Sequence, residues 1–236
     1  MKNEMGGKFM ISSFKRENMF LRYFMLVIGI FFMGTGISLI IKSGTGTSPM
    51  SSLTNVMTQI FPLLTLGMYT FLLNLMFFIL EFVVEPKSFK LVEFIQLAPT
   101  FLLSVAIDIN MILVKNLMPS NYIMQIGILI IGCFFFGLSI ALMVSADVIL
   151  MPGEAFIKIV SQKTGKEYGN IKTYVDVSLV ILAAIVSLIF LHKIYGVREG
   201  TLIAALLIGN MSKLCKKFTN KLIPSVVIED NVGEVE

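Results

Sequence analysis

Residues 23–41 read YFMLVIGIFFMGTGISLII, a run of nineteen positions without a charged side chain. An α-helix needs ~20 such residues to cross the hydrocarbon core of a bilayer. Basic residues precede the run, as in a secretion signal, but it is too long for a signal core and lacks a small-residue cleavage site. We therefore predict a first membrane span that is retained in the protein.

The composition of the whole chain agrees with this prediction. Of its 236 residues, 56% are hydrophobic and 14% are charged, whereas soluble domains carry about 25% charged residues. One globular core cannot hide so much apolar material. The net charge of +4 fits the basic loops of a membrane protein better than a nucleic-acid interface. Cys133 and Cys215 are expected to be free thiols.

Hydropathy predicts an all-α membrane protein with six spans and two shorter helices. The spans are expected at about 21–42, 64–84, 92–114, 122–145, 170–191 and 197–214, and the shorter helices at about 48–61 and 152–164. Six spans place both termini on one side of the membrane. That side would hold fifteen of the nineteen Lys and Arg residues, so the positive-inside rule predicts cytoplasmic termini.

Two segments of the chain resemble each other. One is FMGTGISLIIKSGTGTSPMSSL at residues 32–53, and the other is FFGLSIALMVSADVILMPGEAF at residues 135–156. Matching positions lie 103 residues apart as far as Gln59 and Gln162, and 102 residues apart at Asn74 and Asp176. The match pairs Gly34 with Gly137, Pro49 with Pro152, Gln59 with Gln162 and Asn74 with Asp176.

Because each half would hold three spans, an odd number, the second half must be inverted relative to the first. Inverted repeats are common in secondary transporters, whose substrates bind between the repeats near mid-membrane. The expected division is a basic cytoplasmic N-terminus at 1–20, a first three-helix repeat at 21–115, a second at 116–217, and an acidic cytoplasmic tail at 218–236.

Each short segment has the signals of a helix start. In SGTGTSP, Gly44 and Gly46 favour a tight loop, Ser48 suits the N-cap, and Pro49 suits the first helical position; Pro152 opens the second segment. Both segments are amphipathic at helical spacing. Each could re-enter the membrane beside protein or lie flat at its surface, and the sequence leaves both placements open.

The chain resembles the YczE/YyaS/YitT group of multi-pass bacterial membrane proteins. The resemblance covers about residues 25–215 and is carried by GTGISLIIKSGTGTSP, SADVILMPGEAF, YGNIKTYVDV and VREGTLIAALLIGN. It implies the fold and a location in the cytoplasmic membrane of a bacterium. It implies no biochemical activity.

Ionisable groups within spans are the main candidates for function, because they are costly in lipid. Asp176 lies about two turns into the fifth span, and Asn74 lies near the middle of the second. Together they could bind a cation, a proton or a polar solute in a central cavity. The alternative is that they hydrogen-bond between helices.

Other polar residues lie at turns and span ends. Asp147 and Glu154 flank the Pro152 turn, and Arg198, Glu199, Gly200 and Thr201 open the last span, either as a plain helix start or as an outer gate or anion contact. Glu81 and Asp108 are expected at the membrane interfaces.

No enzymatic motif occurs, and we expect neither a cofactor nor a metal site. The leading hypothesis is a small-solute permease or exporter. A membrane accessory that supports a partner complex is the second hypothesis, and a passive channel is the third. The expected partners are the lipid bilayer and a small polar or ionic solute, with no nucleic acid; self-association or a protein partner stays open.

Overall fold

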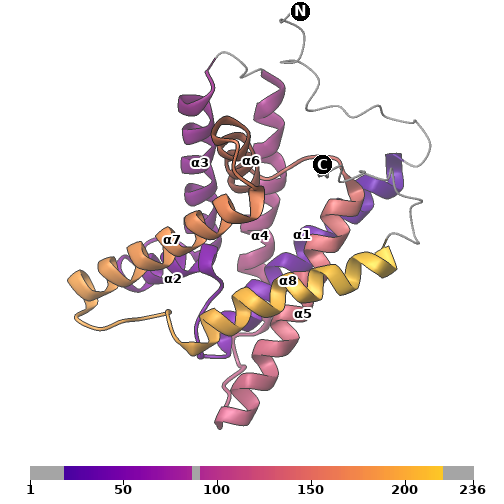
Figure 1. The fold of residues 1–236 in the computed structure, drawn as a ribbon. Coiled ribbons are helices and arrows are strands. Elements are labelled where there is room, and N and C mark those ends of the chain that lie inside the picture. The colour runs from indigo at the N-terminus through magenta and orange to yellow at the C-terminus, as the bar shows by residue number, and fades with distance from the viewer. Residues whose placement is uncertain (1–18, 87–90, 220–236) are drawn as a thin grey trace, which may run out of the picture.

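The computed structural model describes residues 19–86 and 91–219, and these form helices with no β-strand among them. The predicted basic N-terminal segment up to residue 18, Lys87, Lys90 and the acidic tail from residue 220 lie outside the described residues. Figure 1 shows the arrangement of the helices. In chain order they are α1 (Met19–Lys42), α2 (Pro49–Ile60), α3 (Leu66–Val84), the 3-10 helix η1 (Leu91–Gln96), α4 (Leu97–Leu113), α5 (Tyr122–Ala146), α6 (Pro152–Thr164), α7 (Tyr168–Leu191) and α8 (Glu199–Thr219).

The short helices begin where the sequence signals predict. Pro49 and Pro152 each stand at the first helical position, where the missing N–H costs nothing. Ser48 occupies the N-cap of α2, but its side chain makes no capping hydrogen bond and donates to Ser51 Oγ instead, at 2.8 Å. Gly44 has the left-handed backbone that the loop requires (φ 72°).

Five segments are long and apolar enough to cross a membrane. They are α1, α3, Glu93–Leu113, α5 and α7. The sixth predicted span corresponds to α8, which begins at Glu199 and continues to Thr219. This helix is long enough to span, but Lys213, Lys216 and Lys217 in its last turns make it too charged to be counted with the five.

α1 and α5 pack side by side in opposite directions at the centre of the molecule (Figure 1). α4 packs on α1, and α8 packs on α5. Glycine permits each close approach: a Cβ on Gly34 would lie 2.9 Å from the Ala106 carbonyl carbon in α4, and one on Gly137 would lie 2.6 Å from Met211 Cβ in α8.

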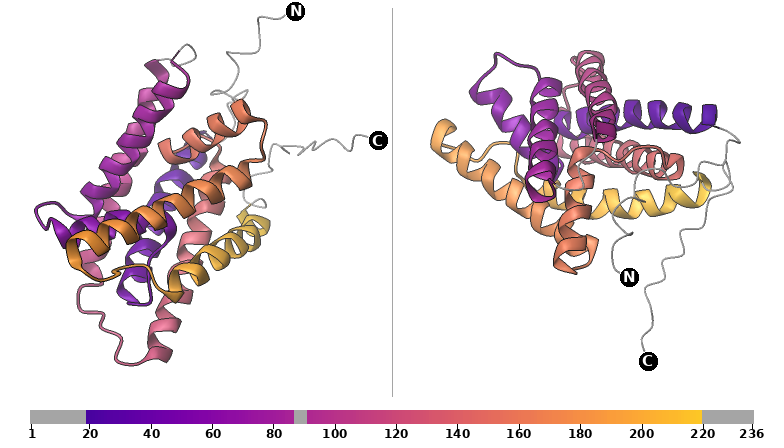
Figure 2. Two further views of the ribbon diagram at one scale, coloured as in Figure 1. Left: turned by 60° about the vertical axis from the view of Figure 1, so that its left-hand side comes forward. Right: turned by 90° about the horizontal axis from the view of Figure 1, so that it is seen from above.

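Two further contacts between helices join the two halves of the chain. α2 packs on α7, and α6 packs on α3. The two halves differ in one packing: α3 and α4 pack along each other, whereas α7 and α8 make at most marginal contact. In Figure 1, α7 lies on the left and α8 on the right, and the view from above in Figure 2 shows their axes inclined to each other.

Candidate functional site

The first turns of α2 and α6 meet near the middle of the molecule. Met50 Cε lies 2.8 Å from where a Cβ on Gly153 would stand, and Asn74 Oδ1 lies 3.8 Å from the same point. Phe77 of α3 and Phe156 of α6 pack together, with their ring centroids 5.5 Å apart. The glycine therefore brings the start of α6 against α2 and against the amide of Asn74.

Asn74 itself is buried, with 8% of its surface exposed. Its Nδ2 donates to the Thr70 carbonyl in the same helix, at 3.0 Å. Among the described residues, its Oδ1 has no hydrogen-bond donor. An acceptor oxygen thus faces the start of α6 without a partner.

Asp176 lies on α7 and is paired with Lys172, one turn earlier. The Lys172 Nζ to Asp176 Oδ2 distance is 3.6 Å, and 22% of the Asp176 side chain is exposed. The other oxygen, Oδ1, is buried and has no hydrogen-bond partner within the part of the chain that the structure describes. Leaving such an acceptor unsatisfied costs about 1–3 kcal/mol.

Glu154 stands in the first turn of α6, where the helix dipole favours a carboxylate. Burial raises the pKa of Glu154, and the positive charge of Lys172 acts in the opposite direction. The carboxyl also borders a small hollow, lined by Met33, Ile140, Met143, Val144, Ile149 and Leu150. We call Asn74, Glu154, Lys172 and Asp176 the central cluster.

The short helix α2 turns its polar face into the protein. Ser51, Ser52 and Asn55 are 0–6% exposed, whereas the apolar Met50 and Leu53 are half-buried. These polar side chains, together with the apolar Val56 at 0% exposed, are therefore surrounded by protein.

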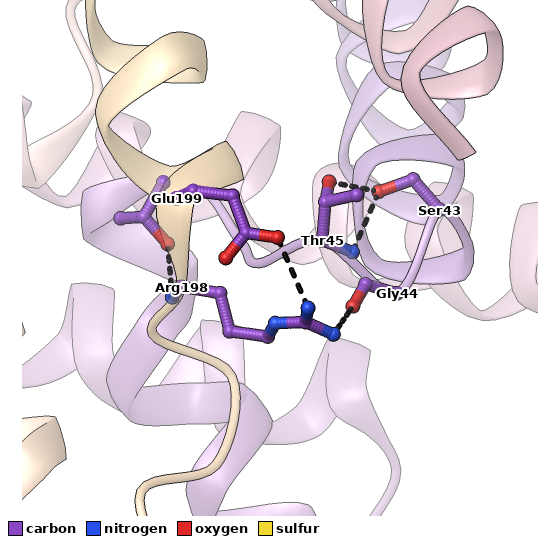
Figure 3. Close-up of polar contacts among 6 residues, drawn as sticks. Ser43, Gly44, Thr45, Arg198 and Glu199 are labelled. Carbon is purple, nitrogen blue, oxygen red and sulfur yellow. Dashed lines mark hydrogen bonds and ion pairs between the residues drawn. The ribbon is translucent and has the colours of Figure 1, made fainter. Parts of the chain in front are cut away.

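A second polar site joins the α1–α2 loop to the start of α8, and Figure 3 shows its charged part. Arg198 Nη1 donates to the Gly44 carbonyl at 3.0 Å, and Nη2 contacts Glu199 Oε1, also at 3.0 Å. The Gly200 N–H donates to the Thr45 carbonyl at 2.9 Å. We call these loop-to-loop contacts the loop junction.

The loop junction continues in the hydroxyl of Thr201, which is buried. Its Oγ1 accepts from the Thr47 N–H at 3.2 Å and from the Arg198 N–H at 3.3 Å. Backbones come so close here that a Cβ on Gly46 would lie 2.6 Å from Thr201 Oγ1, and one on Gly200 would lie 2.4 Å from Thr45 Oγ1. Glycine is therefore required at both positions.

The structure separates the residues singled out in the sequence into groups. Asn74, Glu154 and Asp176 belong to the central cluster. Arg198, Glu199, Gly200 and Thr201 belong to the loop junction. Asp147 ends α5 in a left-handed conformation (φ 45°).

Glu81 and Asp108 make contacts that the sequence did not predict. Only 4% of Glu81 is exposed, and Gln96 Nε2 faces both of its carboxylate oxygens at 3.4 and 3.5 Å. Asp108, which is partly buried, accepts from Thr65 Oγ1 at 2.6 Å and from the Gly67 N–H at 2.9 Å. It thus satisfies donors at the start of α3.

Sequence reasoning also missed Lys172, which it treated only as one of the basic residues of the cytoplasmic side. The available signal was its spacing, since a lysine four residues from an aspartate on a helix can form an ion pair. Within the described segments, no group of three or more His, Cys, Asp or Glu side chains could hold a metal ion.

The fold and these sites define a class of helical protein of membrane character with a polar cluster between its two halves. The chain belongs to the DUF6198 family, a family of unknown function, whose model matches residues 20–217. No curated protein and no solved structure matches the chain.

Proposed function

We propose that this protein is a secondary transporter of small polar or ionic solutes in the cytoplasmic membrane of a bacterium. In this proposal α8 is the sixth span, both termini are cytoplasmic, and α1–α4 and α5–α8 are two inverted repeats. The resemblance to the YczE/YyaS/YitT group is in keeping with this location. We propose neither an enzymatic reaction nor a cofactor.

The repeat is supported by contacts between matching residues. In an arrangement with a two-fold axis, a residue touches its own counterpart only at the axis. Phe32 and Phe135, 103 positions apart, have ring centroids 5.5 Å apart, and Met50 meets Gly153 at the same separation in sequence. Gly44 and Asp147, again 103 apart, both have positive φ. The similarity of the two halves is therefore seen in the spacing of matching residues and also in their backbone conformation.

The single observation that carries the proposal is the place of the central cluster. Asn74 and Asp176 are matching residues of the two halves. Asn74 Oδ1 lies 3.8 Å from where a Cβ on Gly153 would stand, and Asp176 lies on α7, which packs on both short helices. Transporters with inverted repeats bind their substrates between the repeats, often at the N-termini of short or broken helices. Charged groups inside a bundle are retained despite their cost when they serve binding or proton transfer.

Flux through reconstituted protein tests the proposal. Vesicles would contain the purified protein and a trapped pH-sensitive dye, and a panel of amines, amino acids and sugars would be added under an imposed pH gradient. We expect at least one solute to evoke proton movement, and Asp176→Asn to abolish it. Glu167→Gln is the matched control, because it removes an exposed carboxylate at the N-cap of the same helix.

Two results would overturn the proposal. One is that folded protein moves no solute of the panel in either direction. The other is that flux is the same in Asp176→Asn as in the wild type.

A further inference from the structure

A buried carboxyl group lies in the last turn of α3. Glu81 is only 4% exposed, and among the described residues no cationic side chain forms an ion pair with it. Its neighbour is Gln96, the last residue of η1, which is 1% exposed. A buried charge without a counter-charge is costly, so this carboxyl needs another source of stabilisation.

The amide of Gln96 connects two carboxyl groups. Its Nε2 donates to Glu93 Oε2 at 2.9 Å and faces both oxygens of Glu81 at 3.4 and 3.5 Å. The last two distances exceed the 2.7–3.2 Å of a good hydrogen bond. The three carboxyl oxygens therefore surround one nitrogen, and two of them are poorly bonded to it.

The other atom of the same amide is an acceptor without a donor. Gln96 Oε1 is buried and has no hydrogen-bond partner within the part of the chain that the structure describes. Leaving a buried acceptor unsatisfied is unfavourable. Oε1 and Nε2 are bonded to the same carbon atom, so the unsatisfied acceptor belongs to the group that contacts Glu81. This set of polar atoms thus lacks one hydrogen atom.

We infer that Glu81 binds a proton, and that Gln96 holds it in an acid–amide pair with two hydrogen bonds. In this pair the Glu81 O–H donates to Gln96 Oε1, and Gln96 Nε2 donates one N–H to the other Glu81 oxygen. The second N–H of Nε2 keeps its bond to Glu93.

The pair follows from the donors and acceptors of the two groups. A protonated carboxyl has one O–H donor and keeps an acceptor oxygen, and an amide has two N–H donors and an acceptor. A rotation of the Glu81 carboxyl suffices to form both bonds. The proton comes from water, no other covalent bond changes, and the uncompensated charge of Glu81 is removed.

The surrounding charged groups leave the missing hydrogen to be supplied by a proton. On α3, η1 and α6, the elements around this end of α3, the nearest charged side chains are Glu85, Glu93, Lys158 and Lys163. Lys163 donates to the Val84 carbonyl. α2 contains no charged residue, and Asp108 of α4 binds at the opposite end of α3.

A metal ion fits this place less well than a proton. The Gln96 Nε2 group directs its hydrogens at both carboxyl groups, and these hydrogens would repel a cation placed between them. Within the described segments, no group of three or more His, Cys, Asp or Glu side chains could hold a metal ion.

Infrared spectroscopy of the purified full-length protein tests the inference, because a protonated carboxyl has a C=O stretching band that a carboxylate lacks. Spectra would be recorded at about pH 6, where exposed carboxyls are ionised. We expect the wild type to show a band that is absent from Glu81→Gln. Glu167→Gln is the matched control, because it removes an exposed carboxyl and should leave this band unchanged.

Gln96→Leu tests the pairing itself. It should move the Glu81 band to higher frequency, because the carboxyl then makes no hydrogen bond to the amide. Each variant should elute as the wild type does on size exclusion. Glu81→Gln is expected to fold, since glutamine offers the same donor and acceptor as protonated glutamate.

Three results would overturn the inference. One is that Glu81→Gln loses no carboxyl band, and another is that the band has the same frequency in Gln96→Leu as in the wild type. The third is that replacing choline chloride by sodium chloride, at constant ionic strength, removes the band, since the site would then bind a metal cation.

The inference goes beyond the proposed transport, and the two fail separately. If vesicles move a solute in an Asp176-dependent manner but Glu81 shows no band, the transporter stands and the proton site falls. If the band behaves as described but no solute crosses the vesicle membrane, the proton site stands and the proposed transport falls.

Discussion

At the scale of single residues, backbone proximity decides which positions tolerate change. Gly200 and Gly209 lie on the same helix, α8. A Cβ on Gly200 would stand 2.4 Å from Thr45 Oγ1 and 2.7 Å from the Thr45 carbonyl oxygen, whereas nothing lies within 4 Å of one on Gly209. Replacing each glycine by alanine therefore separates the effect of tight packing, at Gly200, from the effect of helix propensity alone, at Gly209.

We predict that Gly200→Ala destabilises the protein by roughly 1–3 kcal/mol, the usual cost of overpacking a tight site. Gly209→Ala should be neutral or should stabilise by up to about 1 kcal/mol, because alanine favours the helix. Reversible unfolding in mixed micelles measures both. Equal effects of the two substitutions would contradict the described approach of α8 to the α1–α2 loop.

The carboxyl of Glu154 gives a pH-dependent stability. Since its pKa is raised by burial in the folded state, the neutral form stabilises the fold below the pKa of the unfolded chain. This stabilisation is lost as the pH rises through the folded pKa.

Glu154→Gln keeps the size of the side chain but cannot ionise. The variant should therefore gain stability relative to the wild type as the pH rises above the usual glutamate range. Unfolding curves of both proteins over that range measure the difference. A constant difference at all pH values would show that Glu154 does not titrate in this way.

At the scale of elements, the loop junction connects segments that are more than 150 residues apart in the chain. Thr201 Oγ1 accepts the Thr47 and Arg198 N–H groups in a buried position. Thr58 Oγ1, in contrast, donates to the Asn55 carbonyl of its own helix at 2.7 Å, and the residue is partly exposed.

We predict that Thr201→Val destabilises the protein by about 1–3 kcal/mol, because it leaves the buried Thr47 N–H and the part-buried Arg198 N–H without an acceptor. Thr58→Val should cost less than about 0.5 kcal/mol, as most substitutions outside the core do. Thermal unfolding in detergent compares them. If Thr201→Val were as mild as Thr58→Val, the junction would contribute little to holding the halves together.

At the scale of the whole molecule, the proposed topology can be tested by labelling. In a background with Cys133→Ala and Cys215→Ala, we place a single cysteine at Lys193, between α7 and α8, or at Lys217, near the end of α8. Six spans predict that a membrane-impermeant reagent labels Lys193→Cys from outside intact cells and Lys217→Cys only after permeabilisation. Labelling of both from outside would mean that α8 does not cross.

The positions of the helices could be predicted from the sequence because they depend on local signals. α6 spans Pro152–Thr164, the same residues as predicted, since proline at its start and glycine after its end act within a few residues. The roles of Glu81 and Asp108 could not be predicted in this way. Their partners, Gln96 and the start of α3, lie 15 or more residues away in the chain, and only the packing of α3 on α4 brings them together.

The same limit applies to the central cluster. The matching of Asn74 with Asp176 was visible in the spacing of the two halves. The pairing of Lys172 with Asp176 could have been predicted from their spacing on one helix. That Glu154 lies near the charge of Lys172 depends on how α6 packs against α7, which no local pattern encodes.

The unequal packing of the two halves has a consequence for motion. α3 packs along α4, but α7 and α8 make at most marginal contact, although the two pairs occupy corresponding places in the chain. In a transporter made of inverted repeats, the first half can adopt the arrangement of the second half, and the second half that of the first. The resulting structure has the same shape but is open to the opposite side of the membrane. The conformation in Figure 1 would then be one end of a cycle, and its partner would join α7 to α8 while parting α3 from α4.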